Sequence, residues 1–164
     1  MENIKRAGLW ILHHVISISL TGSFGALLYS VWNIALWFLY PEAMAEKNVF
    51  FMFFFYLTFQ IAALYQSKAI LLFVANESLF RKFRLPFVVF VIISGVIGFF
   101  LAYLTVADNW SMVNGQGLRL PRQIQHYCCL TIAAISYSFF SRKVYRWLFR
   151  EPKTPPVVSG KLIQ

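Results

Sequence analysis

The chain has 164 residues, of which 59% are hydrophobic, 19% aromatic and only 13% charged. Soluble domains carry roughly 25% charged residues, so this composition is typical of a protein whose solvent is lipid. No polar stretch is long enough to form a soluble catalytic domain, and two cysteines cannot hold together a disulfide scaffold. We therefore expect an all-α, polytopic integral membrane protein.

The first apolar run extends from Ala7 to Tyr40 without a charged residue. As a helix it would be about 50 Å long, whereas the hydrocarbon core of a bilayer is about 30 Å thick. The run is either one long tilted helix or a span over residues 8–30 followed by a segment at the membrane interface. It exceeds the apolar core of a cleaved leader peptide, which has about 7–15 residues, so we expect it to be retained.

The second run, over residues 48–68, is rich in phenylalanine and ends at Lys68, whose long side chain can reach the headgroups. Apolar residues continue after it but give way to Asn76, Glu77 and Arg81. We interpret this part as a helix that projects into the cytosol or bends along the membrane surface, with Glu77 in a polar connection.

Residues 86–106 form the clearest span, because no charge interrupts them and Pro86 suits the first turn of a helix. The polar stretch 107–125 contains the turn signal Asn114-Gly115 and is expected to be a loop. The fourth span is expected over residues 126–146, with basic side chains near its end that reach the headgroups. Residues 1–150 would then make a four-helix transmembrane bundle, and 151–164 a short cytoplasmic tail that contains prolines.

The orientation follows from the lysines and arginines that flank the four spans. Twelve of the fifteen lie on the side that holds both termini and the second connection, and the other three are Lys47, Arg119 and Arg122. Because positive residues accumulate in cytoplasmic loops, both termini are expected in the cytoplasm. The same bias favours a bacterial inner membrane as the location.

The basic segments after the second and fourth spans are candidate contacts for an acidic cytosolic protein or for anionic lipid headgroups. Arg142, Arg146 and Arg150 are spaced four apart and would share one helical face. Nucleic acid is not expected as a partner, since the charge lies beside the spans rather than on a separate domain. The candidate residues are Arg81, Lys82, Arg84, Arg142, Lys143, Arg146 and Arg150.

Small residues four apart occur in three of the expected spans. Such pairs let helix backbones approach closely in lipid, either within one bundle or between copies of the chain. The residues are Gly22 and Ala26 in the first span, Ser94, Gly95 and Gly98 in the third, and Ala134 and Ser138 in the fourth.

Three amides, Asn33, Gln60 and Gln66, would line a pore if several copies formed a ring. Their alternative role is hydrogen bonding between helices, which is common in membrane bundles. The six acidic residues are all expected in flanks or connections, which counts against a proton-driven transporter.

Neither a metal nor a cofactor is expected. His13 and His14 are neighbours that point about 100° apart on a helix, and His126 is expected at the opposite end of the membrane. We interpret all three as polar residues near the interface, and Cys128 and Cys129 as small packing residues. The sequence also lacks the spacing of a phosphate-binding loop, a zinc site or a nucleophilic triad, so catalysis is not expected.

These features favour a small non-enzymatic membrane subunit, anchor or sensor. It would assemble with itself or with another membrane protein, as a homo-oligomer or as part of a larger complex, and engage a cytosolic partner through its basic segments. A homo-oligomeric pore is the main alternative, and a haem- or quinone-binding subunit is a lesser one.

Overall fold

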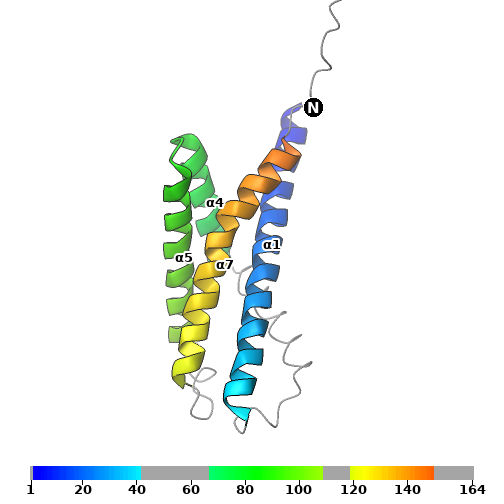
Figure 1. Cartoon of the computed structure of the whole chain (residues 1–164). Coiled ribbons are helices and arrows are strands. Elements are labelled where there is room, and N and C mark those ends of the chain that lie inside the picture. Colours follow the sequence, from blue (N-terminus) through cyan, green and yellow to red (C-terminus); the bar gives the residue numbers. More distant parts are fainter. Residues whose placement is uncertain (1, 42–66, 109–118, 150–164) are drawn as a thin grey trace, which may run out of the picture.

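The computed structural model describes residues 2–41, 67–108 and 119–149, and the regular structure in these ranges is entirely α-helical. The helices in chain order are α1 (Glu2–Leu39), α4 (Ser67–Lys82), α5 (Phe87–Asp108) and α7 (Arg119–Leu148) (Figure 1). Two of them, α1 and α5, are long and apolar enough to cross a membrane.

α1 is a single helix of 38 residues, which decides between the two alternatives left open for the first apolar run. At 1.5 Å per residue it is about 57 Å long, and its apolar part extends over Ile4–Leu39. The helix is therefore longer than a bilayer core is thick, and it would either tilt in the membrane or extend beyond it.

α5 contains the second candidate span, Phe87–Leu104, which agrees with the span expected over residues 86–106. Pro86 lies directly before the helix, where its missing N–H costs nothing, and its carbonyl accepts a hydrogen bond from the N–H of Val89 at 3.0 Å. The span expected over residues 48–68 falls almost entirely outside the described residues. Of the helices that the structure describes, α1 and α5 are those with both the length and the apolar composition of a span.

α7 differs from the sequence-based expectation at its beginning. Residues 119–125 were expected in a loop, but they form the first two turns of the helix. Pro121 fits in the first turn, and Gln125 is completely buried against α1. The polar residues at this point therefore reflect a helix interface rather than a loop.

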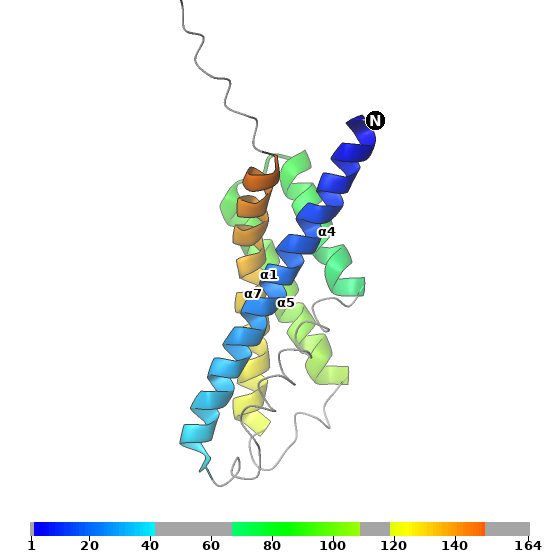
Figure 2. The same cartoon turned by 90° about the vertical axis from the view of Figure 1, so that its right-hand side faces the viewer.

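α7 lies between α1 and α5 and packs along both, while α4 is joined to α5 by a tight turn (Figures 1 and 2). Arg84 in this turn has a φ of 49°, in the left-handed region that often ends a helix. The N–H of Leu85 donates to the carbonyl of Phe80 at 3.1 Å, which closes the end of α4. The turn makes α4 and α5 neighbours and turns one face of α4 toward the other helices.

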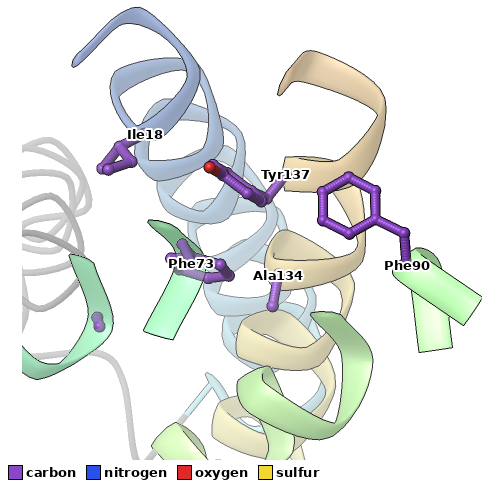
Figure 3. Close-up of a cluster of buried hydrophobic side chains, with 6 residues drawn as sticks. Ile18, Phe73, Phe90, Ala134 and Tyr137 are labelled. Carbon is purple, nitrogen blue, oxygen red and sulfur yellow. The ribbon is translucent and has the colours of Figure 1, made fainter. Parts of the chain in front are cut away.

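A small apolar core joins all four helices (Figure 3). Ile18 of α1, Phe73 of α4 and Phe90 of α5 meet Ala134 and Tyr137 of α7. The ring centroids of Phe73 and Tyr137 are 4.6 Å apart. This core fixes the position along the bundle axis at which α4 contacts α1 and α7. It thereby positions the polar residues that lie next to the core.

Polar side chains are buried along the bundle beside this apolar core, while large apolar side chains are exposed on its outside. Along α1 the buried side includes His13, Ser17 and Thr21, whereas the outer side exposes large apolar residues. α5 likewise exposes an apolar face. Buried hydroxyls such as Ser17 and Thr21 donate to carbonyls one turn earlier in their own helix, at 2.7 and 2.8 Å. The exposed apolar residues are Ile11, Val15, Leu20, Leu27 and Val31 of α1 and Val88, Ile92, Val96 and Phe99 of α5.

Candidate functional site

A buried carboxylate, that of Glu77, lies where α1, α4 and α7 meet. Ala69, Phe73 and Glu77 recur every four residues on α4, and all three are completely buried. The expectation that Glu77 belongs to a polar connection is therefore wrong. α4 folds back on the bundle, and the helical stripe that buries Phe73 carries Glu77 into the interior with it.

Both oxygens of Glu77 accept hydrogen bonds. His13 Nε2 lies 2.7 Å from Oε1, and Arg81 donates to the same oxygen from Nε at 2.9 Å and from Nη2 at 2.6 Å. The Tyr137 hydroxyl donates to Oε2 at 2.8 Å, and His14 Nδ1 lies 3.6 Å from that oxygen. We refer to these five residues, His13, His14, Glu77, Arg81 and Tyr137, as the Glu77 cluster.

The Glu77 cluster compensates the buried negative charge. Burial alone raises the pKa of the Glu77 carboxyl, but the hydrogen bonds from His13, Arg81 and Tyr137 outweigh it and bring this pKa from 4.5 to about 2. The carboxylate is thus ionised, and the Arg81 guanidinium balances its charge. Such fully paired geometry is what makes a buried ion tolerable.

The arrangement of His13 indicates its tautomer. Its Nδ1 atom is buried without a hydrogen-bond partner, whereas Nε2 faces Glu77. A hydrogen on Nδ1 would be an unpaired buried donor, which is costly, so the hydrogen belongs on Nε2 and is donated to the carboxylate.

Aromatic rings enclose the charged end of Arg81. Its guanidinium carbon lies 3.4 Å from the ring centroid of Tyr145 and 5.5 Å from that of Trp10. Trp10 in turn stacks on His14, with ring centroids 5.1 Å apart and planes 29° apart. The Arg81 side chain keeps 23% of its surface exposed, so this is the side on which the Glu77 cluster meets the exterior.

A second polar cluster joins α1 and α7 toward their other ends. Gln125 donates from Nε2 to the carbonyl of Tyr29 at 3.2 Å and to Asn33 Oδ1 at 3.1 Å. The Tyr29 hydroxyl lies 3.2 Å from His126 Nε2. Asn33, expected either in a pore or between helices, thus contacts a residue of its own chain, while Gln60 and Gln66 lie outside the described residues.

Exposed basic side chains from three segments share one end of the bundle. The beginning of α1, the turn between α4 and α5 and the last turns of α7 all lie at this end (Figures 1 and 2). Arg142 additionally lies 4.7 Å from the ring centroid of Phe87. The exposed residues, which we call the basic end, are Lys5, Arg6, Lys82, Arg84, Arg142, Lys143 and Arg146.

The basic end does not include two of the residues expected to contact a partner. Arg81 was grouped with the exposed basic residues, but its guanidinium is held by Glu77 and by aromatic rings. Arg150 lies outside the described residues. The remaining five candidates, Lys82, Arg84, Arg142, Lys143 and Arg146, are all exposed.

The small residues lie mainly at contacts within the chain. A Cβ atom at Gly98 would be 2.5 Å from the Cβ of Ala134 and 2.7 Å from the carbonyl oxygen of Leu130, so α5 and α7 touch at their backbones there. Gly95 faces Ile135 of α7. Ser94 accepts a hydrogen bond from Asn76 at 3.0 Å. Gly22, Ala26, Ala134 and Ser138 are buried as well.

The Glu77 cluster was not expected from the sequence, for a specific reason. His13 and His14 were taken to be poor co-ligands because neighbours diverge on a helix. Both nevertheless face Glu77, and one donor atom from each of the three residues lies within 4.8 Å of the others. The signal that the sequence did offer was the four-residue stripe on α4 that ends in Glu77. Cys128 and Cys129, in turn, are free thiols, the first partly and the second fully buried.

Comparison of the chain with protein-family models, with curated proteins and with solved structures gives no match.

Proposed function

We propose that the chain is a small, non-enzymatic integral membrane protein, an anchor or sensor subunit, whose basic end engages an acidic partner on the cytoplasmic side. The observation that carries this proposal is the basic end itself. Seven exposed lysines and arginines from three segments lie together there, and no acidic side chain that the structure describes is exposed beside them.

Membrane insertion is supported by the outer surface of the bundle. α1 and α5 are long and apolar enough to cross a bilayer, and both expose large apolar residues along their length. In water, molecules with such an apolar surface would aggregate, whereas lipid solvates the surface. Buried hydroxyls such as Ser17 and Thr21 are satisfied within their own helix, as a membrane interior demands.

The positive-inside rule supports the orientation. Lysine and arginine accumulate on the cytoplasmic side of membrane proteins, so the basic end belongs there, and the N-terminus and the end of α7 belong there with it. A bacterial inner membrane, with both termini cytoplasmic, is the location we propose. The seven basic residues complement an acidic protein surface in charge, which favours its encounter and its orientation at the basic end.

Charge reversal at the basic end tests the proposal. The chain is purified in detergent with its associated proteins, and native mass spectrometry gives the composition of the complex. We expect Lys82→Glu with Arg84→Glu, and Arg142→Glu with Lys143→Glu, to lose a stoichiometric acidic partner. Arg119→Glu with Arg122→Glu places the same charge change at the beginning of α7, at the opposite end, and is expected to keep that partner. Equal composition of all three variants would contradict a role for the basic end in partner binding.

A further inference from the structure

The Glu77 cluster brings three metal-binding side chains together from two helices. His13 and His14 of α1 and Glu77 of α4 each contribute one donor atom, and these atoms lie within 4.8 Å of one another. His13 Nε2 is 2.7 Å from Glu77 Oε1, and His14 Nδ1 is 3.6 Å from Oε2. Around a tetrahedral zinc ion with bonds of about 2.1 Å, neighbouring donors are about 3.4 Å apart, so His13 Nε2 would have to move outward from its hydrogen-bonding distance of 2.7 Å to Glu77 Oε1.

We propose that His13, His14 and Glu77 form a binding site for a divalent transition-metal ion of the zinc type, and that Arg81 competes with the ion for Glu77. Two imidazole nitrogens and one carboxylate oxygen are a donor set that zinc accepts, with a fourth position left for water. Coordination through His13 Nε2 requires the hydrogen of that ring to move from Nε2 to Nδ1. Ca²⁺ and Mg²⁺ are disfavoured because they take oxygen ligands almost exclusively.

One hydrogen bond around these three residues is of the kind that orients metal ligands. Ligand carboxylates and imidazoles are usually oriented by further hydrogen bonds. Here the Tyr137 hydroxyl holds Glu77 Oε2 at 2.8 Å, whereas His13 Nδ1, the nitrogen that would not bind the ion, is buried without a hydrogen-bond partner. His13 and Glu77 are fully buried, while His14 keeps 16% of its side chain exposed.

Arg81 sets the direction in which the metal affinity should change when this side chain is removed. Its guanidinium donates twice to Glu77 Oε1, so it occupies the position of a cation on this carboxylate. A divalent ion bound by Glu77 would repel it. The guanidinium already lies over the Tyr145 ring and is partly exposed, so it can move outward and keep an aromatic partner. Removal of Arg81 is therefore expected to strengthen metal binding, although it weakens the metal-free cluster.

The test is titration of the full chain with ZnCl₂ in detergent micelles, after purification through a tag without histidines. Cys128→Ser and Cys129→Ser are introduced in every variant, since adjacent thiols bind zinc themselves. We expect one Zn²⁺ per chain. His14→Phe keeps the stack on Trp10 and leaves the other contacts of Glu77 in place, and it is expected to weaken binding about a hundredfold. Arg81→Met is expected to strengthen binding at least about tenfold.

His126→Phe is the matched control, because it removes a histidine that contacts Tyr29 on the far part of α1. It is expected to leave the zinc affinity unchanged. Co²⁺ reports the geometry independently, since four-coordinate Co²⁺ has strong visible absorption that should disappear in His14→Phe. A folded chain that binds no zinc, a His14→Phe variant that binds as the parent does, or an Arg81→Met variant that binds more weakly would each overturn the proposal.

Discussion

Glu77 shows how one buried residue can connect three helices. Its two oxygens accept hydrogen bonds from α1, α4 and α7, and its charge is balanced by Arg81 one turn later on its own helix. Removing one partner of a buried ion pair costs about 3–5 kcal/mol, far more than an exposed pair contributes. Glu77 should therefore be the side chain whose change affects stability most among the charged residues described.

The variant Glu77→Gln tests this in the presence of a metal chelator. We expect it to lower the free energy of unfolding at pH 7 by about 3 kcal/mol, because Arg81 and His13 lose a charged acceptor. The measurement is denaturation in detergent micelles, followed by circular dichroism. Lys82→Gln, which changes a neighbouring exposed charge, is expected to alter stability by less than about 0.5 kcal/mol.

The parent and Glu77→Gln should also differ in how their stability depends on pH. The native pKa of Glu77 is about 2, below its ordinary value of 4.5, so ionised Glu77 stabilises the fold fully above pH 4.5. That contribution is lost as the pH falls from 4.5 toward 2. The parent should therefore lose stability over this window more steeply than Glu77→Gln does, and identical slopes would contradict a lowered native pKa of Glu77.

At the scale of elements, the contact between α5 and α7 depends on the absence of a side chain at Gly98. A Cβ there would meet the Ala134 Cβ at 2.5 Å, the Leu130 carbonyl oxygen at 2.7 Å and the Thr131 Cα at 2.9 Å. Two of these atoms belong to the backbone of α7, so the helices themselves would have to separate.

We expect Gly98→Ala to destabilise the protein by about 1–3 kcal/mol, since it forces packed helices apart. Gly8→Ala is the matched control on α1, where an added Cβ would meet nothing within 4 Å. Alanine favours a helix over glycine by about 1 kcal/mol, so the control should be neutral or stabilising. Thermal unfolding in detergent compares the two, and equal effects would mean that α5 and α7 do not touch at Gly98.

The elements also show which parts of the structure the sequence can predict. Hydropathy correctly indicated α1 and α5. A helix makes the backbone hydrogen bonds of a long apolar segment within that segment, so such a segment is expected to be helical. Hydropathy failed for residues 119–125 of α7, since Gln125 is polar yet buried against α1. It failed again for Glu77, because a single sequence does not say that α4 folds back on the bundle. Burial of polar groups depends on partners distant in the chain, such as Gln125 with Asn33 and Glu77 with His13.

Across the described helices, large apolar side chains are exposed on α1 and α5, the buried carboxylate of Glu77 is hydrogen-bonded, and basic side chains gather at one end. A bundle that lies in a membrane with its basic end in the cytoplasm would have all three features. The physical reason is the same for each, because lipid surrounds the middle of such a bundle and water surrounds its ends.

The basic end is expected to face the cytoplasm, and the reactivity of a single cysteine reports the side of the membrane on which it lies. In a chain with Cys128→Ser and Cys129→Ser, Lys82→Cys places a single thiol at an exposed position of the basic end. A membrane-impermeant maleimide is applied to intact spheroplasts and to inverted inner-membrane vesicles. We predict labelling in the inverted vesicles alone. Labelling in the spheroplasts, or recovery of the chain in the soluble fraction, would contradict the account.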